Sequence, residues 1–288
     1  MPELPEVETI ARGLETRVRG RRIVTAWFGE KPGPCKSPAE EMLRALMGRY
    51  IQRAHRVGKH IVFDLAQVPK AAPVAQWLVH LGMTGRMLVA QPGAPLPAHT
   101  HAVLQLDDQR EVRFVDPRRF GRLSVFWPRP NAKVPVNKAK NGAFQGFTGT
   151  GREPLEVSDE EFYSLFHPRH APIKALLLNQ SLLQGIGNIY ADEGLFRARV
   201  RPQRRANRLT WEEMRRLRRA LQSVLRQAIA QGGSSVSDYV DAEGVEGLFQ
   251  LQHRVYQRTG APCRVCKTAI RRIVLAGRST HYCPHCQH

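Results

Sequence analysis

The chain has 288 residues, a length typical of about two domains that each bury a core. Its 44 Lys and Arg residues outnumber 25 Asp and Glu residues, giving a formal net charge of +19, while the hydrophobic fraction of 42% is ordinary for a globular protein. This charge favours a polyanionic partner, either nucleic acid or an anionic membrane. The sequence shows no run of about 18 apolar residues and no apolar signal segment, so we expect a soluble intracellular protein, which favours nucleic acid over a membrane. Composition alone leaves open that the arginines only reflect genome bias or solvated helix faces.

The first two predicted elements are helices. Apolar residues recur at three- and four-residue steps over residues 4–18, which places them on one helix face. A short second helix is predicted after Ser37, which can cap it together with Glu40. Pro38 suits the first turn of this helix and Gly48 suits its end.

Residues 50–127 carry a different pattern of short apolar or alternating runs rich in β-branched and aromatic residues. These runs predict strands, among them residues 61–65, 77–81 and 87–89. Residues 102–106 and 111–115 flank a tight polar turn, which predicts a β-hairpin. We therefore predict an antiparallel β-sandwich with flanking helices for the first part of the chain.

The second half of the sequence is dominated by helix signals. It follows residues 128–151, which are rich in Pro, Gly, Asn and Lys and are predicted to form a linker or surface loop. Ser158 with Glu161 and Thr210 with Glu213 are predicted capping boxes. The helix after Thr210 is predicted to bury one apolar face formed by Trp211, Met214, Leu217, Leu221, Val224 and Leu225. The overall fold class is therefore α+β.

Four cysteines near the end of the chain form two CxxC pairs, Cys263 with Cys266 and Cys283 with Cys286. Two such pairs separated by sixteen residues are typical of a four-thiolate zinc site on a hairpin. The alternative is two disulfides, but Cys35 makes the cysteine count odd and intracellular thiols stay reduced. We predict one structural Zn²⁺, because four protein ligands leave no position for a catalytic water.

Motifs spread along the whole chain carry a resemblance to one family. They are PELPEVE at 2–8, GKH at 58–60, HLGMTGRM at 80–87, DPRRFGR at 116–122, QGIGNIYADE at 184–193, and CRVC with THYCPHCQ in the cysteine segment. In this order they resemble the bacterial formamidopyrimidine-DNA glycosylases. The resemblance implies a β-sandwich catalytic domain over 1–127, a helix-two-turn-helix domain over 152–250, and a zinc finger over 251–288.

The resemblance implies catalytic roles for four residues. Pro2, freed by removal of Met1, would attack C1′ of a damaged nucleotide, and Glu3 would act as general acid. Lys59 would act near the lesion phosphate in β-elimination, and Arg278 would grip phosphate during δ-elimination. Glu6 lies one turn further along the first helix, and the sequence leaves open whether it acts directly or only satisfies backbone donors.

The resemblance also implies contacts with damaged double-stranded DNA. A base must leave the stack before an enzyme amine reaches C1′, and the vacated space must be filled. The residues implied to fill it are Met83, Arg118 and Phe120. Further implied DNA contacts are His80, His99, Arg169, Asn188 and Tyr256. The segment 232–249 matches the loop that covers an extruded purine, although its glycines also fit an inert linker.

Excision of oxidised purines is the function that the resemblance implies, and two alternatives to it remain open. One is the sister branch that removes oxidised pyrimidines by the same mechanism, and the other is a zinc-ribbon nucleic-acid binder that has lost catalysis. Pro2, Glu3 and Lys59 together argue against a non-catalytic protein. We expect a cytoplasmic bacterial monomer with no membrane partner.

Overall fold

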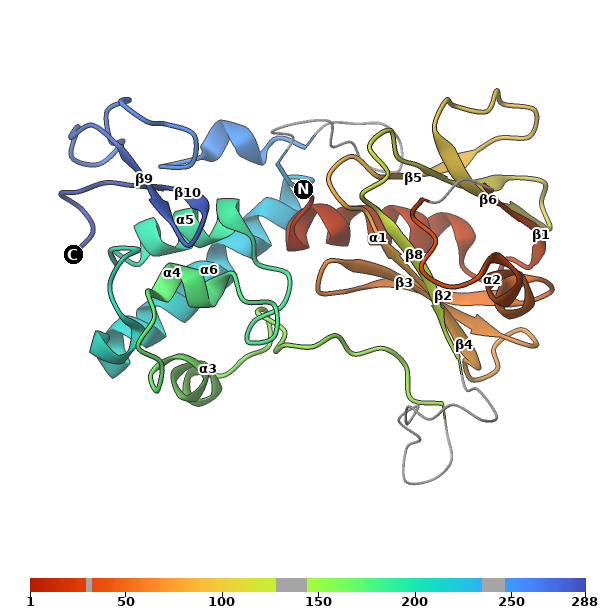
Figure 1. The fold of residues 1–288 in the computed structure, drawn as a ribbon, viewed down its shortest axis with the longest axis horizontal. Coiled ribbons are helices and arrows are strands. Elements are labelled where there is room, and N and C mark those ends of the chain that lie inside the picture. The colour runs from red at the N-terminus through yellow and green to blue at the C-terminus, as the bar shows by residue number, and fades with distance from the viewer. Residues whose placement is uncertain (30–32, 128–143, 235–246) are drawn as a thin grey trace. The chain divides into compact units, whose positions relative to one another are not determined.

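The computed structural model describes residues 1–29, 33–127, 144–234 and 247–288 (Figure 1). The chain separates into two compact units. The described part of unit 1 comprises residues 1–2, 6–148 outside the gaps, and 247; unit 2 comprises 3–5, 149–234 and 248–288. Most of the predicted 128–151 linker and of the predicted 232–249 loop lies outside the described residues. Among the described helices, none has the length and apolar character needed to cross a bilayer.

Helix α1 (Leu4–Val18) forms as its periodicity predicts, and every residue of its predicted apolar face is buried. Helix α2 (Ala39–Leu46) also forms, but the predicted Ser37 cap is wrong. Pro38 occupies the N-cap position without a side-chain bond, and the Ser37 hydroxyl accepts a hydrogen bond from the backbone N–H of Val125 at 3.1 Å. The hydroxyl is used by a neighbouring strand, which local sequence does not reveal.

Unit 1 contains two four-stranded antiparallel sheets, as predicted. One sheet has the order β1 (Ile23–Phe28), β6 (Thr100–Leu106), β7 (Glu111–Val115), β5 (Arg86–Ala90). The other has the order β2 (Tyr50–Val57), β3 (His60–Ala66), β4 (Ala75–His80), β8 (Arg122–Phe126). The predicted hairpin is confirmed as β6 and β7, paired from Thr100 with Val115 to Gln105 with Glu111. Apolar side chains of both sheets and of α1 form one continuous core.

Unit 2 is built from helices and a small hairpin. The helices are α3 (Asp159–Phe166), α4 (Ile173–Leu177), α5 (Asn188–Arg197) and α6 (Trp211–Ala230), with short 3₁₀ turns at Ala206–Arg208 and Phe249–Gln252. Both predicted capping boxes are confirmed at the starts of α3 and α6. Helix α6 buries its predicted face except for Trp211, which is 38% exposed. Trp211 is the first residue of the helix, and its ring packs edge-on against Tyr163.

The hairpin of unit 2 consists of β9 (Arg271–Leu275) and β10 (Arg278–Tyr282), paired antiparallel. Its hydrophobic core is small and consists of Phe196, Val255, Cys263, Ile270 and Cys283. Two of these five core side chains are cysteines of the CxxC pairs. The hairpin therefore depends on what the cysteines bind more than on apolar burial.

Candidate functional site

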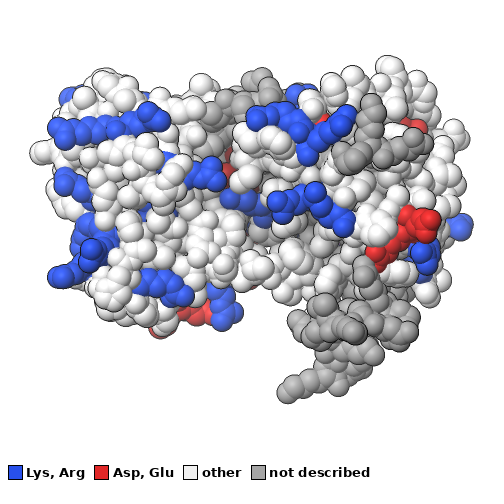
Figure 2. Space-filling view, in the orientation of Figure 1, with Lys and Arg blue, Asp and Glu red and all other residues white. Residues whose placement is uncertain are grey.

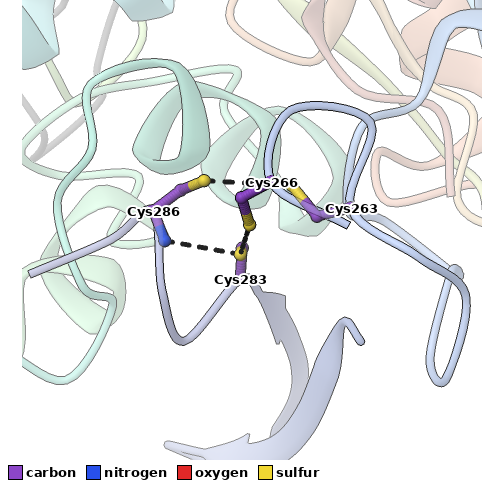
Figure 3. Close-up of side chains that lie close together, drawn as sticks. All are labelled: Cys263, Cys266, Cys283 and Cys286. Carbon is purple, nitrogen blue, oxygen red and sulfur yellow. Dashed lines mark hydrogen bonds between the residues drawn. The ribbon is translucent and has the colours of Figure 1, made fainter. Parts of the chain in front are cut away.

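The four predicted zinc ligands meet at one point in unit 2 (Figure 3). Their sulfur atoms all lie within 4.8 Å of one another, with Cys263 and Cys286 at 3.9 Å and Cys266 and Cys283 at 3.5 Å. Zn–S bonds of about 2.3 Å in a tetrahedron require sulfur separations of about 3.8 Å, whereas a disulfide requires about 2.05 Å. The cluster fits one structural zinc ion, which the four thiolates would fully coordinate.

Glu3 is held at the N-terminus of α5 in unit 2. Its buried carboxylate accepts hydrogen bonds from the backbone N–H groups of Gly187 (2.9 Å), Ile189 (3.0 Å) and Tyr190 (3.4 Å). A helix N-terminus presents free N–H groups and a positive dipole end, which suit an anion. A Cβ on Gly187 would lie 2.2 Å from Cδ of Glu3, so glycine is required there. Sequence reasoning found Glu3 but missed this cradle, for which the glycines of QGIGN are the signal.

Lys59 lies in the turn between β2 and β3 of unit 1 and is almost fully buried. Arg56 supports this turn, because its Nη1 donates to the carbonyl of Gly58 at 3.3 Å. The same guanidinium donates through Nε to Glu8 on α1 at 2.8 Å. The Lys59 turn is thereby tied to the helix that follows the chain start. Pro2 is half-buried ahead of this helix, and Glu6 is buried within it.

Two large apolar side chains of unit 1 stand exposed on loops. Met83 follows β4 and is 43% exposed, and Phe120 precedes β8 and is 52% exposed. The Arg118 guanidinium lies 4.7 Å from the centre of the Phe120 ring, a cation–π distance. The predicted trio is therefore accessible to a ligand. His99 lies in a neighbouring loop with a φ of 63°, an unusual conformation for a non-glycine residue.

His80, at the end of β4, makes its hydrogen bond and its ring contact within unit 1. Its Nδ1 accepts from the backbone N–H of Gly82 at 3.1 Å, and its ring packs edge-on against His60. Burial, followed by the nearby His60 and cations, lowers the pKa of His80 to about 4. The imidazole is therefore neutral at pH 7, and its Nδ1 is the acceptor that orients the loop carrying Gly82.

The predicted DNA contacts of unit 2 lie in different settings. Asn188 begins α5 and donates through Nδ2 to the Ser279 carbonyl at 2.8 Å, next to the exposed Arg278 of β10. Tyr256 packs edge-on against the His281 ring, and burial raises the pKa of its phenol. Arg169 is less available, because its guanidinium donates to the Leu165 carbonyl at the end of α3.

A buried ionic cluster in unit 2 was missed by sequence reasoning. Nζ of Lys174, fully buried on α4, lies 2.7 Å from Oδ1 of Asp192 on α5. The same amine donates to the Ser279 carbonyl (2.9 Å) and the Thr280 hydroxyl (2.8 Å) of β10. Oδ2 of Asp192 accepts from the His281 backbone N–H at 2.9 Å. The available signal was charged residues among apolar ones, Lys174 in IKALL and Asp192 beside Glu193 in YADEGLF.

A second missed carboxylate is Glu193 on α5. It accepts hydrogen bonds at 2.9 Å from the backbone N–H groups of Arg254, Val255 and Tyr256. Burial raises the pKa of Glu193, while these three donors oppose the shift. The carboxylate fixes the backbone of the segment that carries Tyr256.

The surface is rich in basic side chains. Figure 2 shows many Lys and Arg residues on one face of the molecule and few Asp and Glu residues. Such an excess of cations attracts the phosphates of nucleic acid and makes the attraction sensitive to salt.

Comparisons with known proteins agree along the whole chain. Family models match at 1–123 (formamidopyrimidine-DNA glycosylase N-terminal domain), 150–240 (formamidopyrimidine-DNA glycosylase H2TH domain) and 260–288 (zinc finger found in FPG and IleRS). The formamidopyrimidine-DNA glycosylase of Solibacter usitatus is 45% identical over 289 residues, covering 100% of this chain and 99% of the relative.

Two solved structures of Lactococcus lactis Fpg are also similar, and each match covers 100% of both chains. A variant in complex with Fapy-dG containing DNA has a TM-score of 0.84 and 31% identity. The wild-type protein in complex with an oxidized pyrimidine containing DNA has a TM-score of 0.82 and 29% identity.

Proposed function

The chain belongs to the formamidopyrimidine-DNA glycosylase family, and we propose that it excises oxidised purines from duplex DNA and then cleaves the strand at the same site. Membership makes it a DNA glycosylase. The observation that carries the proposal is the Glu3 carboxylate, held by three backbone N–H groups directly after Pro2 in the chain. The similar Lactococcus protein in complex with Fapy-dG containing DNA supports formamidopyrimidines as substrates, and we include 8-oxoguanine in the same proposed class of oxidised purines.

The proposed nucleophile is the amine of Pro2 after Met1 has been removed. An α-amino group has a pKa near 8, against about 10.4 for a lysine side chain, so more of it is unprotonated at neutral pH. Its nitrogen forms a bond to C1′ as the bond from C1′ to the damaged base breaks. The Glu3 carboxylate takes up the proton that the amine loses and passes it to the ring oxygen O4′, while the departing base takes a proton from solvent. The C1′–O4′ bond then breaks, and the nitrogen lone pair forms the iminium ion.

The iminium ion explains why strand cleavage follows base removal. A secondary amine condensed with the opened sugar stays cationic, so it withdraws electrons and acidifies the hydrogens on C2′. Loss of a C2′ proton expels the 3′ phosphate, and a second elimination expels the 5′ phosphate. We assign Lys59 to the first of these phosphates and Arg278 to the second. A cationic side chain stabilises the negative charge of a phosphate as it leaves.

DNA recognition would begin with phosphate contacts and end with base extrusion. We assign His99, Arg169, Asn188, Tyr256 and His80 to the DNA backbone or lesion, and Met83, Arg118 and Phe120 to the vacated space. Segment 232–249 would cover the extruded base. The corresponding domains are 1–127, 152–250 and 251–288, joined by 128–151. Because the substrate is chromosomal DNA, we place the enzyme in the bacterial cytoplasm as a monomer.

The decisive experiment is borohydride trapping on duplex DNA that contains 8-oxoguanine opposite cytosine. The Met-processed enzyme should form a covalent adduct and cleave the strand, whereas Pro2→Gly and a form that retains Met1 should not cleave. All three should bind duplex DNA alike, and binding should weaken with salt at a log–log slope of about −0.9 per neutralised phosphate. Absence of an adduct with the processed enzyme would contradict the proposed chemistry.

A second candidate function is excision of oxidised pyrimidines. The observation that favours it is the similar Lactococcus structure in complex with an oxidized pyrimidine containing DNA. Competition between duplexes that carry 8-oxoguanine opposite cytosine and thymine glycol opposite adenine separates the two candidates. Faster excision of thymine glycol would replace the purine assignment.

A further inference from the structure

Asp116 is a fully buried carboxylate in unit 1, at the point where β7 ends and the loop to β8 begins. It belongs to neither sheet ladder, and both of its oxygens accept hydrogen bonds from loops. Burial of a carboxylate costs free energy unless hydrogen-bond donors compensate it, and these loop donors do so for Asp116.

The two oxygens of Asp116 join the two loops that carry the proposed wedge residues. Oδ1 accepts from the Thr84 hydroxyl at 2.5 Å, and Thr84 directly follows Met83. Oδ2 accepts from the backbone N–H of Gly121 at 2.7 Å, and Oδ1 also receives the backbone N–H of Arg118 at 3.3 Å. These bonds tie the loop of Met83 and the 118–121 segment to the same carboxylate.

The same two loops also pack directly against each other through their backbones. A Cβ on Gly82, whose φ is +65°, would lie 2.5 Å from the carbonyl carbon of Phe120. A Cβ on Gly121 would lie 2.4 Å from the ring of Phe114. The loops therefore touch backbone to backbone, and a shift of one displaces the other.

Asp116 also fixes a third loop through its own backbone. Its N–H donates to the His99 carbonyl at 3.0 Å, and its carbonyl lies 2.9 Å from Nε2 of the buried His101. His99 has a positive φ, a conformation that persists only where the surroundings hold it.

We propose that Asp116 is the positioning residue that presents Met83, Arg118, Phe120 and His99 to DNA as one preformed surface. This inference rests on the proposed function, because it assigns no new chemistry and explains how base extrusion is supported. A wedge that is already fixed loses little conformational freedom on binding, so its contact energy is available to unstack the base pair. Because Asp116 is fully buried, it acts through these loops and not on the nucleotide.

The test separates base extrusion from chemistry. Thr84→Val removes the donor to Asp116 with little change of volume, Thr84→Ser keeps that donor, and Asp116→Ala removes the whole junction. Asp64→Asn is the matched control, because Asp64 accepts from Gln76 near one end of the β3–β4 ladder, whereas the Met83 loop follows His80 at the opposite end. Each variant is assayed for excision of 8-oxoguanine from duplex DNA and for cleavage at an abasic site in single-stranded DNA, where no stacked base is displaced. Circular dichroism monitors folding.

We expect duplex excision to slow by roughly 10- to 100-fold in Thr84→Val, the range expected when a hydrogen bond to a buried carboxylate is lost. Asp116→Ala should slow it further, while Thr84→Ser and Asp64→Asn stay within about threefold of the unmodified enzyme. Single-strand cleavage should be unchanged in Thr84→Val. A 2-aminopurine next to the lesion should show a smaller fluorescence rise, because less unstacking occurs.

Two results would overturn the inference. One is a folded Thr84→Val enzyme with normal duplex excision and a normal 2-aminopurine signal. The other is an equal loss of duplex excision and single-strand cleavage, which would mean that the junction supports the chemistry itself. Failure of the proposed function would differ from both, because the unmodified enzyme would then form no borohydride adduct on either substrate.

Discussion

The two units of the molecule use buried polar groups in different ways. In unit 1 the strands are aligned by two hydrogen-bonded sheets, and buried polar groups serve the loops beyond the strand ends. Asp116 joins two of these loops, and Arg113 donates to the carbonyls of residues 94 and 95 at 2.7 Å. In unit 2 the Lys174 and Asp192 pair instead connects α4, α5 and β10 to one another.

The difference has a physical origin in what aligns each kind of element. A strand in a sheet has its register fixed by backbone bonds and by the alternation of its side chains. Helices and a small hairpin share no such ladder, and the finger hairpin buries few apolar side chains. Their mutual placement in unit 2 therefore depends on directional contacts, namely zinc–thiolate bonds and buried ion pairs.

Removal of zinc should have the largest effect and should be confined to unit 2. We expect Cys286→Ser, or a chelator, to unfold residues 263–288, because structural zinc contributes about 10–16 kcal/mol in zinc-finger peptides. The core of the hairpin is too small to compensate. Hydrogen exchange should show lost protection in β9 and β10 and unchanged protection in β3 and β4. Equal loss of protection in both units would show that zinc also stabilises unit 1, which contradicts the prediction.

The next largest effect should come from the buried ion pair. Lys174→Met leaves the Asp192 carboxylate buried without its cation, which should cost about 3–5 kcal/mol in the free energy of unfolding. Burial lowers the pKa of Lys174 and the Asp192 carboxylate opposes this shift, so the carboxylate helps to keep the amine charged. Urea titration of unit 2 measures the loss.

The controls for the ion pair are a double variant and a surface pair. Combining Lys174→Met with Asp192→Asn removes both charges but keeps an acceptor for the backbone N–H of His281, so part of the stability should return. Arg215→Met breaks an exposed pair with Glu212 on α6 and should cost less than about 1 kcal/mol. A Lys174→Met loss no larger than that of Arg215→Met would show that the pair is dispensable.

Most of the fold could be predicted from the sequence, because the patterns that indicate its helices, hairpin and zinc ligands are local. The α1 and α6 faces follow from helical periodicity, and the hairpin of β6 and β7 follows from two runs around a polar turn. Both capping boxes are four-residue patterns, from the N-cap to the third helical residue, and they are the same in sequence and in structure. The cysteine spacing was likewise sufficient to locate the zinc ligands.

The errors and omissions involve partners that lie far away in the sequence. Ser37 bonds with Val125, 88 residues away, instead of capping the adjacent helix. Lys174 and Thr280, 106 residues apart, meet only after the hairpin docks on α4 and α5. Composition marks such a lysine as unusual within an apolar helix but cannot name its partner. Composition likewise does not reveal that the backbone N–H groups at the start of α5 donate hydrogen bonds to Glu3.

An intermediate effect is expected from acid, separately in each unit. Burial lowers the pKa of His80 in unit 1 and of His253 in unit 2 to about 4, below the usual value of 6.5. Protonation therefore favours the unfolded chain, so this stability is complete above pH 6.5 and is lost as the pH falls toward 4. We expect each histidine to contribute on the order of 1–3 kcal/mol to this loss.

Single substitutions show whether the acid response follows the two units. His253→Gln should flatten the dependence of unit 2 stability on pH between 6.5 and 4 and leave unit 1 unchanged. His80→Gln should do the reverse. Hydrogen exchange at a series of pH values, corrected for the intrinsic exchange rate, measures both units in one sample. A parallel change in both units with either variant would mean that they unfold together.

The smallest effect concerns Ser37 and tests where its hydroxyl acts. Ser37→Ala should cost about 0.5–1.5 kcal/mol through the lost hydrogen bond, and loss of a true helix cap would cost a similar amount. Magnitude therefore does not distinguish the two roles, but location does. The Val125 amide should exchange faster in the variant, because its acceptor is gone, while the first-turn amides of α2 keep their protection.

Thr210→Ala provides the comparison. The Thr210 hydroxyl accepts from the backbone N–H of Glu213, so protection should fall at that amide of α6. Faster exchange at the start of α2 with an unchanged Val125 would restore the capping role predicted from sequence.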